Sequence, residues 1–190
     1  MKTRRLLLMT MLALLASVTY ADTYNDNESG LTYTYQKNGT TASVKLNDFT
    51  RTSVTIPATV TIKNKEYQVT AIDDYGFCKK VEWWQKDILT YTYNGKSYTI
   101  DGSNYNNTVL KSVTFEQPSN ITTIGSYAFN SCTKLESIVI PNSVTSMGEA
   151  AFKGCISLTD VHFQTNADGS VNLKKIPTQC FRYCPFTSIE

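Results

Sequence analysis

The sequence predicts an α/β repeat solenoid, and three observations support this prediction. The first is a copied motif, in which an apolar residue is followed by Ala-Phe and then, three residues later, by Cys. It runs from Ile124 to Cys132 and again from Met147 to Cys155. The second is the interval between the copies, 23 residues at both ends (124 to 147, 132 to 155). The third is the apolar spacing that follows, as at Leu135, Ile138 and Ile140. Such a period and core spacing are typical of leucine-rich coils stacked on one continuous core.

Residues 1–21 are predicted to be a secretory signal peptide. It has a charged start, an apolar stretch and a small-residue cleavage site: Lys2, Arg4 and Arg5, then Leu6 to Ala16, then Thr19-Tyr20-Ala21. The apolar run of about eleven residues is shorter than the about 20 that span a bilayer. An uncleaved membrane anchor is the alternative, and no Cys follows the run to support a lipid anchor. We therefore expect an exported protein.

The charge balance argues against nucleic acid as a partner. The chain has 18 Lys and Arg against 16 Asp and Glu, and three of the basic residues lie in the signal peptide. The remaining 190 − 21 = 169 residues therefore carry 18 − 3 = 15 positive charges against 16 negative ones. No basic field is left to attract nucleic acid or an anionic membrane. No later stretch is long and apolar enough for membrane insertion after signal cleavage.

Residues 22–50 are predicted to form a β-hairpin cap, because the first coil of a solenoid needs cover from water. Two alternating runs flank an Asn-Gly turn at residues 38–39: Leu31, Tyr33 and Tyr35, then Ala42, Val44 and Leu46. The solenoid is expected over residues 51–190. Its first coil begins near Val54, which is spaced from Ile56 as Ile138 is from Ile140.

An aromatic insertion interrupts the repeats at about residues 81–109. Its middle is predicted to be a second β-hairpin around Asn94-Gly95. This turn sets two cross-strand pairs, Tyr91 with Tyr98 and Leu89 with Ile100. Residues 89–93 also repeat the Leu-Thr-Tyr-Thr-Tyr sequence of residues 31–35. The insertion is therefore interpreted as a duplicated piece of the cap.

Each coil is expected to contribute one short strand to a parallel sheet, at residues 110–115, 135–140 and 158–163. Side chains alternate along a strand. The inward set is Val113, Phe115, Ile138, Ile140, Val161 and Phe163, and the outward set is Ser112, Thr114, Ser137, Val139, Asp160 and His162. The Ala-Phe segments are expected to form short helical turns on the opposite wall, which makes the predicted class α/β.

The repeated motif also resembles a known family. The sequence Ile-Gly-x-x-Ala-Phe-x-x-Cys-x-x-Leu-x-x-Ile-x-Ile-Pro, from Ile124 to Pro141, resembles the BspA-type leucine-rich repeat of bacterial surface proteins. The resemblance covers residues 54–190. It implies a right-handed leucine-rich-repeat coil on a secreted or cell-surface bacterial protein, in a family often credited with adhesion to host matrix proteins. It names no ligand, because a fold does not define a function.

No pattern of catalytic residues occurs in the sequence. The single histidine, His162, lies on an outward strand position, and Asp160 on the same strand face does not make a pocket with it. Nucleophilic catalysis needs a histidine held by a third group. Neither a glycine-rich phosphate loop nor metal-ligand spacing is present. We therefore expect no enzyme, no cofactor and no metal.

Three of the five cysteines occupy one repeat position, three residues after the Phe. Cys132, Cys155 and Cys184 therefore predict a column of small buried thiols with a packing role. Export would permit oxidation. A disulfide within the column stays open as an alternative, as does a Cys180–Cys184 pair.

The candidate ligand-binding surface combines the outward set with the aromatic insertion. Trp83 and Trp84 flank that set and are residue types that make rigid contact surfaces. The alternative is that both tryptophans plug the junction between insertion and solenoid. The predicted function is adhesin-like binding of a host protein or glycan outside the cell.

The competing prediction is a non-binding structural or assembly fragment of a larger repeat surface protein. Residues 186–190 read as the first half of another coil. Such an end leaves an exposed parallel edge. We therefore expect self-association through the C-terminal edge under this alternative.

Overall fold

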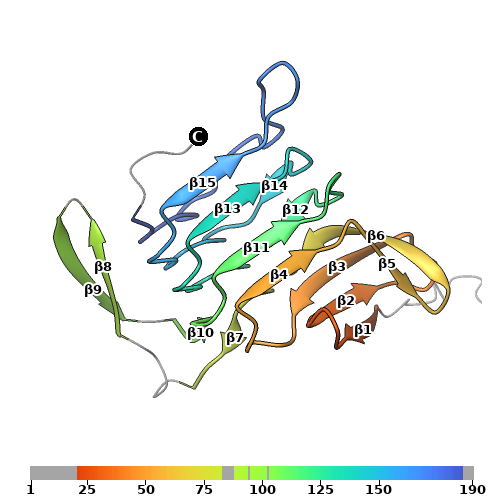
Figure 1. Cartoon of the computed structure of the whole chain (residues 1–190), viewed down its shortest axis with the longest axis horizontal. Coiled ribbons are helices and arrows are strands. Elements are labelled where there is room, and N and C mark those ends of the chain that lie inside the picture. Colours follow the sequence, from red (N-terminus) through yellow and green to blue (C-terminus); the bar gives the residue numbers. More distant parts are fainter. Residues whose placement is uncertain (1–20, 83–87, 94, 102, 186–190) are drawn as a thin grey trace, which may run out of the picture.

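The computed structural model describes residues 21–82, 88–93, 95–101 and 103–185. The predicted signal peptide, apart from Ala21, lies outside these residues, and so does the predicted half coil at 186–190. The described chain winds as stacked coils between two β-sheets (Figure 1). Parallel strands link coil to coil, as a repeat fold requires.

The front sheet, called sheet B here, consists of four parallel strands in the order β15-β13-β11-β4. They are β4 (Ser53–Ile56), β11 (Ser112–Phe115), β13 (Ser137–Ile140) and β15 (Asp160–Phe163). The three expected strands each begin two residues later than predicted. Their preceding leucines, at 110, 135 and 158, are fully buried before the strand starts.

The opposite sheet, called sheet A, has seven strands in the order β1-β2-β3-β6-β12-β14, with β5 pairing to β6. They are β1 (Asp22–Asp26), β2 (Leu31–Tyr35), β3 (Thr41–Leu46), β5 (Thr59–Ile62), β6 (Lys65–Ile72), β12 (Thr123–Ile124) and β14 (Ser146–Met147). The β2–β3 hairpin pairs Leu31 with Leu46, as predicted. Strand β1 was not predicted, because Asp22–Asp26 lacks apolar alternation. Strand β3 pairs parallel with β6, so the cap continues sheet A.

The expected helical turns are absent, and the described residues contain no helix. The α/β class is therefore wrong for this part of the chain. Left-handed backbone angles, which break a right-handed helix, occur at one position in the first motif copy and at two in each of the three later copies. The first position lies three residues after the motif's first apolar residue, and it is held by Tyr75, Tyr127, Ala150 and Gln179. The second lies two residues after the motif's Phe, and it is held by Ser131, Gly154 and Tyr183.

On this wall alternate backbone amides donate to the neighbouring coil, and the amides between them donate within their own coil. The amide of Phe77 donates to the carbonyl of Ala128 (2.7 Å), and the amide of Phe129 donates to the carbonyl of Ala151 (2.7 Å). The amide of Phe152 continues the ladder to the carbonyl of Cys180 (2.9 Å). A helix would need these amides for bonds within its own turn. The sheet-like bonding therefore replaces the predicted helices.

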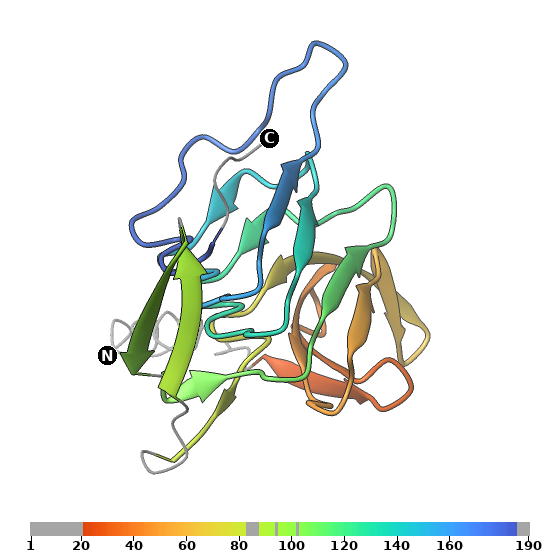
Figure 2. The same cartoon turned by 60° about the vertical axis from the view of Figure 1, so that its left-hand side comes forward.

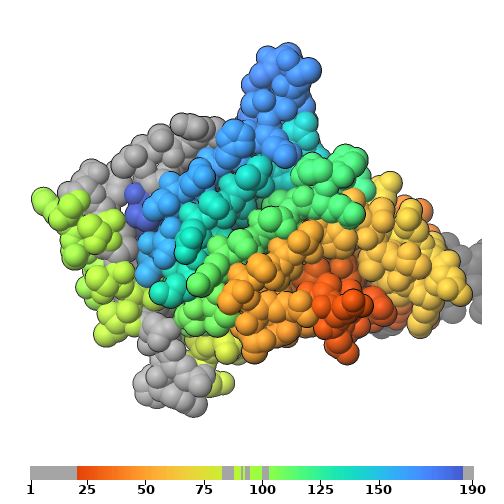
Figure 3. Space-filling model, viewed as in Figure 1, coloured from red at the N-terminus to blue at the C-terminus, as the bar shows by residue number. Residues whose placement is uncertain are grey.

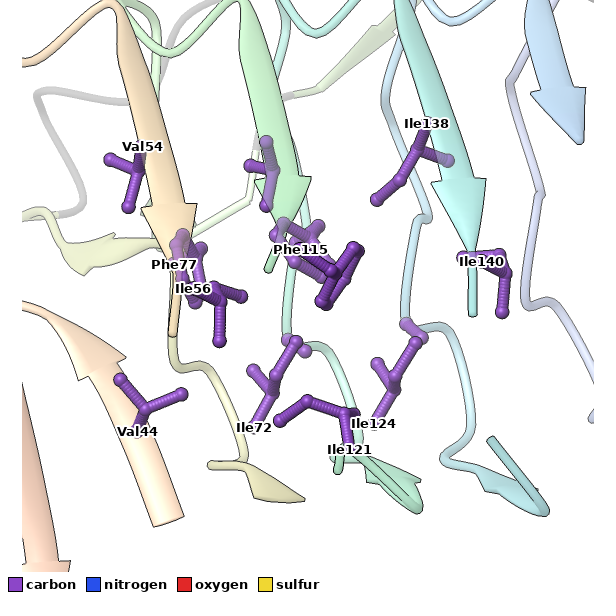
Figure 4. Packing of buried hydrophobic residues seen from close by; sticks show 14 of the residues in the cluster. Val44, Val54, Ile56, Ile72, Phe77, Phe115, Ile121, Ile124, Ile138 and Ile140 are labelled. Atoms are coloured by element: carbon purple, nitrogen blue, oxygen red, sulfur yellow. The ribbon is translucent and has the colours of Figure 1, made fainter. Parts of the chain in front are cut away.

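The core lies between the two sheets and contains the motif phenylalanines in a stack. The rings of Phe77 and Phe129 are 4.8 Å apart, those of Phe129 and Phe152 4.9 Å, and those of Phe152 and Phe181 5.2 Å. Figure 4 shows Phe77 with the inward residues of β4, among them Val54 and Ile56. Burying one such side chain stabilises the fold by about 1.5–3 kcal/mol.

The glycine after the motif's first apolar residue lets neighbouring coils approach. A Cβ added to Gly148 would collide with the backbone of Ser126 in the preceding coil. The Gly148 amide also donates to the carbonyl of Ile124 (2.8 Å). Pro177 holds this position in the last described coil. Proline has a Cβ and no N–H, so sheet A has no strand beyond β14 in the part of the chain described.

The insertion contains two small antiparallel sheets. Strand β7 (Lys79–Lys80) pairs with β10 (Tyr105–Asn106) where the insertion leaves and rejoins the solenoid. Strand β8 (Ile88–Tyr93) pairs with β9 (Lys96–Asp101) as the predicted hairpin. Its register, Leu89 with Ile100 and Tyr91 with Tyr98, is confirmed. Figures 1 and 2 show this hairpin to one side of the stacked coils.

Candidate functional site

The outer face of sheet B carries the outward set in two aligned columns. The parallel register places Ser53, Ser112, Ser137 and Asp160 side by side, and it places Thr55 beside Thr114 and Val139 beside His162. Strand bounds and alternation put all eight on the outer face, and all are exposed except half-buried Ser112. Figure 3 shows this face as a ribbed surface of parallel bands from β4 to β15. The repeat spacing of about 4.8 Å between strands sets the distance between neighbours in a column.

The first coil extends both columns, and the outward set predicted from sequence omitted it. Ser53 and Thr55 belong to β4, which pairs with β11 over its full length. The Thr55 and Thr114 hydroxyl oxygens are 2.9 Å apart and hydrogen-bonded. The sequence could have predicted Ser53 and Thr55 as outward residues. Val54 and Ile56 have the inward spacing, so the residue before them and the residue between them had to face outward.

The sheet B face contains no catalytic arrangement. His162 and Asp160 project from one strand face, and neither side chain has a hydrogen bond or ion pair within the part of the chain described. The surface offers hydroxyl groups, one carboxylate, one imidazole and Val139, whose residue surface is 44% exposed. Such a surface can bind by contact and hydrogen bonding.

The tryptophans of the candidate site, Trp83 and Trp84, lie outside the described residues. The described part of the insertion still exposes large side chains. Ile88 is 72% exposed and Tyr98 is 41% exposed, whereas Leu89 is buried. The insertion therefore presents apolar and aromatic surface next to the solenoid.

A tyrosine cluster that sequence reasoning missed connects the insertion to the coils. The ring of Tyr75 stacks on that of Tyr127, with centroids 5.0 Å apart and planes 5° apart. Tyr105, at the end of the insertion, lies 4.2 Å from Tyr75. The sequence could have indicated the contact between Tyr75 and Tyr127, because the two residues occupy the same repeat position. All three are half-buried, so they tie β10 to the repeat wall.

The five cysteines are free and buried. In the predicted column, each thiol donates to the carbonyl of the Phe one coil earlier. The Cys155 thiol lies 3.1 Å from the carbonyl oxygen of Phe129, and the Cys184 thiol lies 3.2 Å from that of Phe152. Burial raises the pKa of both thiols well above the ordinary value. These thiols therefore stay protonated and act in packing, not as nucleophiles or thiolate ligands.

No group of three or more His, Cys, Asp or Glu side chains that could hold a metal ion occurs in the described part of the chain. Within the same residues, no helix is long and apolar enough to cross a membrane.

The repeat motif decides the family. The model of the BspA type leucine-rich repeat region matches residues 70–190, which is 121 of the 190 residues. The chain belongs to the BspA-type leucine-rich-repeat family. Its members are surface proteins and are typically not enzymes. The match begins after β4, although β4 pairs in register with β11 as a further coil. No curated protein matches the sequence.

One solved structure supports the fold, and others are reported as similar. The chain is similar to the pneumococcal vaccine antigen PcpA, with a TM-score of 0.51 and 18% identity over 90% of this chain and 49% of that one. The BspA-type chain thus spans about half the length of PcpA. A leucine-rich-repeat protein of Bacteroides capillosus is 22% identical, with a TM-score of 0.44, over 75% of this chain and 98% of its own. A leucine-rich cell surface protein of Faecalibacterium prausnitzii is 18% identical, with a TM-score of 0.27, over 82% and 62%.

Proposed function

We propose that this BspA-type protein is exported by bacteria and binds an extracellular protein or glycan through the outer face of sheet B. The observation that supports the proposal is the pair of aligned outward columns on β4, β11, β13 and β15. Small hydroxyl residues fill most positions there, which leaves room for a ligand to approach the strands. A solenoid presents extended surfaces of this kind to its partners.

Binding is proposed in preference to catalysis because the face combines contact groups without an acid–base pair. The ligand would lie across several strands and contact both columns. Val139 and the neighbouring hydroxyls would provide apolar contact and hydrogen bonds, and Asp160 and His162 would provide polar contacts at one end. Trp83, Trp84 and the insertion flank this face in the proposal.

The test uses the exported chain, residues 22–190 by the expected cleavage, on immobilised matrix proteins and on a glycan array. Ser137→Arg places a long charged side chain in the middle of the first column. We expect this variant to lose ligand binding, with His162→Ala causing a smaller loss.

Ser146→Arg is the matched control, because Ser146 is an exposed serine of the same coil in β14 on the opposite wall. Its binding should equal that of the wild type. If Ser137→Arg and the wild type bind every ligand equally, the sheet B face is not the binding surface.

A second candidate function is assembly. Among the residues described, β15 pairs on one side only, with β13, so its other edge can accept a parallel strand. This predicts self-association that grows with protein concentration, measured by light scattering. A strictly monomeric protein at high concentration would contradict assembly and leave the binding proposal untouched.

A further inference from the structure

The outer face of sheet A contains a hollow where the cap joins the first coil. Strand β3 lies between β2 and β6 in sheet A (Figure 1), and residues of all three strands line the hollow. Its volume is about 430 Å³, within the range of about 300–1,000 Å³ that ligand sites occupy. We call this feature the cap hollow. It lies on the opposite sheet from the face proposed above.

Strand alternation places the polar lining of the cap hollow on the outer side of sheet A. Thr34 and Ser43 are half-buried, and each lies between two buried core residues, so both point away from the core. They lie directly opposite each other in the β2–β3 pairing. Among the described residues, three threonines, one serine and one glutamine line the hollow: Thr34, Gln36, Thr41, Ser43 and Thr70.

A β-bulge brings Thr70 to this surface. In the parallel pairing of β3 with β6, successive residues of β3 lie opposite Val69 and Ala71, so Thr70 has no partner in β3. Thr70 and Ala71 are consecutive, yet both are half-buried and face the same side, with Val69 and Ile72 buried on either side of them. Bulges re-aim side chains in this way and are frequent next to functional sites.

The bulge also leaves the Thr70 hydroxyl without the bond that its counterparts form. Thr122 and Thr145 hold the same repeat position in the next two coils. The Thr145 hydroxyl donates to the carbonyl of Thr122 (3.3 Å), and the Thr122 hydroxyl donates to the carbonyl of Thr70 (3.2 Å). The series ends there, because the Thr70 hydroxyl has no hydrogen-bond partner among the residues described.

The other four side chains of this polar set are equally uncommitted. Within the part of the chain that the structure describes, the side chains of Thr34, Gln36, Thr41 and Ser43 form no hydrogen bond. Hydroxyl and amide groups can both donate and accept. The cap hollow therefore offers a ligand five side chains for hydrogen bonding, drawn from three strands and the turn between two of them.

The chemistry of the lining favours a neutral ligand with many hydroxyl groups. No charged residue is among the described residues that line the hollow. Lys37, in the turn beside it, pairs with Asp22 (3.5 Å). An anionic ligand would be bound more strongly by charged donors, and an apolar one by a mainly apolar pocket. Sugar hydroxyls match the polar set, and Ala71 offers apolar contact to the C–H face of a sugar ring.

The position of the hollow argues against an added strand as the ligand. Extended peptides join a sheet through the unpaired backbone groups of an edge strand. The cap hollow lies over the face of β2, β3 and β6, and each of these strands has a neighbouring strand on both sides. Side chains therefore supply the contacts at this site.

We propose that the cap hollow binds a short neutral saccharide through the side chains of Thr34, Ser43 and Thr70. The sugar hydroxyls bond to these groups and to the Gln36 amide. Ala21 borders the hollow, and the expected signal-peptide cleavage after this residue would remove it and widen access. The site is separate from the sheet B face and does not depend on ligand binding there.

The test titrates the exported chain, residues 22–190 by the expected cleavage, with maltotriose, cellotriose or triacetylchitotriose. Trigalacturonate is the charged comparison. Amide chemical shifts in NMR spectra report binding residue by residue. We expect at least one neutral trisaccharide to cause saturable shifts at Thr34, Ser43 and Ala71, without shifts in β11 or β13. Trigalacturonate should cause none at the cap hollow.

Two arginine variants test the location of the site. Ser43→Arg places a long charged side chain in the hollow and should abolish the saturable shifts. Ser146→Arg is the matched control, because the strand register places Ser146 in the same row of sheet A as Ser43, beyond Ala71 and Thr123. Its saccharide binding should equal that of the wild type.

Two valine variants test hydrogen bonding without a change of shape. Thr70→Val should weaken saccharide binding about two- to tenfold, which is the typical net effect of one hydrogen bond. Thr123→Val is the matched control, because Thr123 is half-buried in β12 and is not among the residues that line the hollow. Its binding should equal that of the wild type. Circular dichroism melting curves check that each variant folds like the wild type.

Absence of saturable shifts with every neutral trisaccharide would overturn the proposal. Equal effects of the two arginine variants, or of the two valine variants, would overturn it as well. Tighter binding of trigalacturonate than of the neutral saccharides would assign the hollow to anions and would also overturn it. Ser137→Arg should leave binding at the cap hollow unchanged, which separates this site from the sheet B face.

Discussion

The interior coils and the last described coil have the same repeat but differ in burial. Ile124 and Phe129 are fully buried in an interior coil. At the equivalent positions of the last coil, Ile176 is 43% exposed and Phe181 is half-buried. An interior coil has a neighbouring coil on both sides, whereas the last coil of the described residues has one on a single side. Burial in this molecule is therefore supplied by neighbouring coils and not by the motif alone.

The largest expected effect comes from removing a ring from each region. Phe129→Ala leaves a cavity between two stacked rings and should cost about 3–5 kcal/mol of unfolding free energy. Phe181→Ala removes a half-buried ring and should cost about 1–2 kcal/mol. Urea unfolding followed by circular dichroism measures both losses. Equal losses would mean that the two coils are packed alike.

A side chain added at the close contact between interior coils should have the next largest effect on stability. Gly148→Ala adds a Cβ where the backbone of Ser126 lies, so the coils must separate. We expect a loss of about 1–3 kcal/mol, as for overpacked cores. Gly169→Ala is a control for the loss of a glycine, because nothing lies near a Cβ at that position, although its φ of +81° adds local strain. A Gly148→Ala protein as stable as wild type would show that the coils can move apart freely.

Alkaline pH tests the buried thiols in both regions. Burial raises the pKa of Cys78 and of Cys180 from 9.0 to about 12. Their stability contribution is complete below pH 9, where both folded and unfolded thiols are protonated, and is lost as pH rises from 9 toward 12. Raising the pH from 8 to 10 should lower the free energy of unfolding by about 1 kcal/mol for each of these two thiols. Cys180→Ala should lose less stability over this range than wild type, and an identical pH dependence would contradict the assignment.

The smallest expected effect comes from making the last coil like an interior one. Pro177→Gly restores an N–H that can donate to the carbonyl of Met147, as Gly148 does to Ile124. We expect a stability change within about 0.5 kcal/mol, because the gained bond is offset by backbone entropy. Hydrogen exchange should show protection at the new amide. Rapid exchange there would mean that the missing N–H of Pro177 is not what keeps this hydrogen bond from forming.

Alternating and repeated patterns predicted much of this fold. The inward and outward sets of sheet B followed from the period of two, and the β8–β9 register followed from Asn94-Gly95. The prediction of helical turns was wrong because Tyr127, Ala150 and Gln179 adopt left-handed backbone angles. These residues are not glycine, so their residue types did not indicate such angles. Strand β1 was missed because its pairing comes from backbone bonds and not from apolar residues.

The candidate site was predicted only in part. The six outward residues followed from alternation, and Ser53 and Thr55 could have been added by the same rule. Ligand binding by the sheet B face stays a prediction.

The ladder between Phe77, Phe129 and Phe152 has a mechanical consequence. Its hydrogen bonds point along the direction in which coils follow one another, so tension in that direction opens them one after another like a zipper. The coil of 23 residues from 124 to 146, once released, would extend to roughly 80 Å of chain. We therefore expect a surface protein built in this way to unfold coil by coil under shear flow. The end coil, which is the least buried, should unfold first.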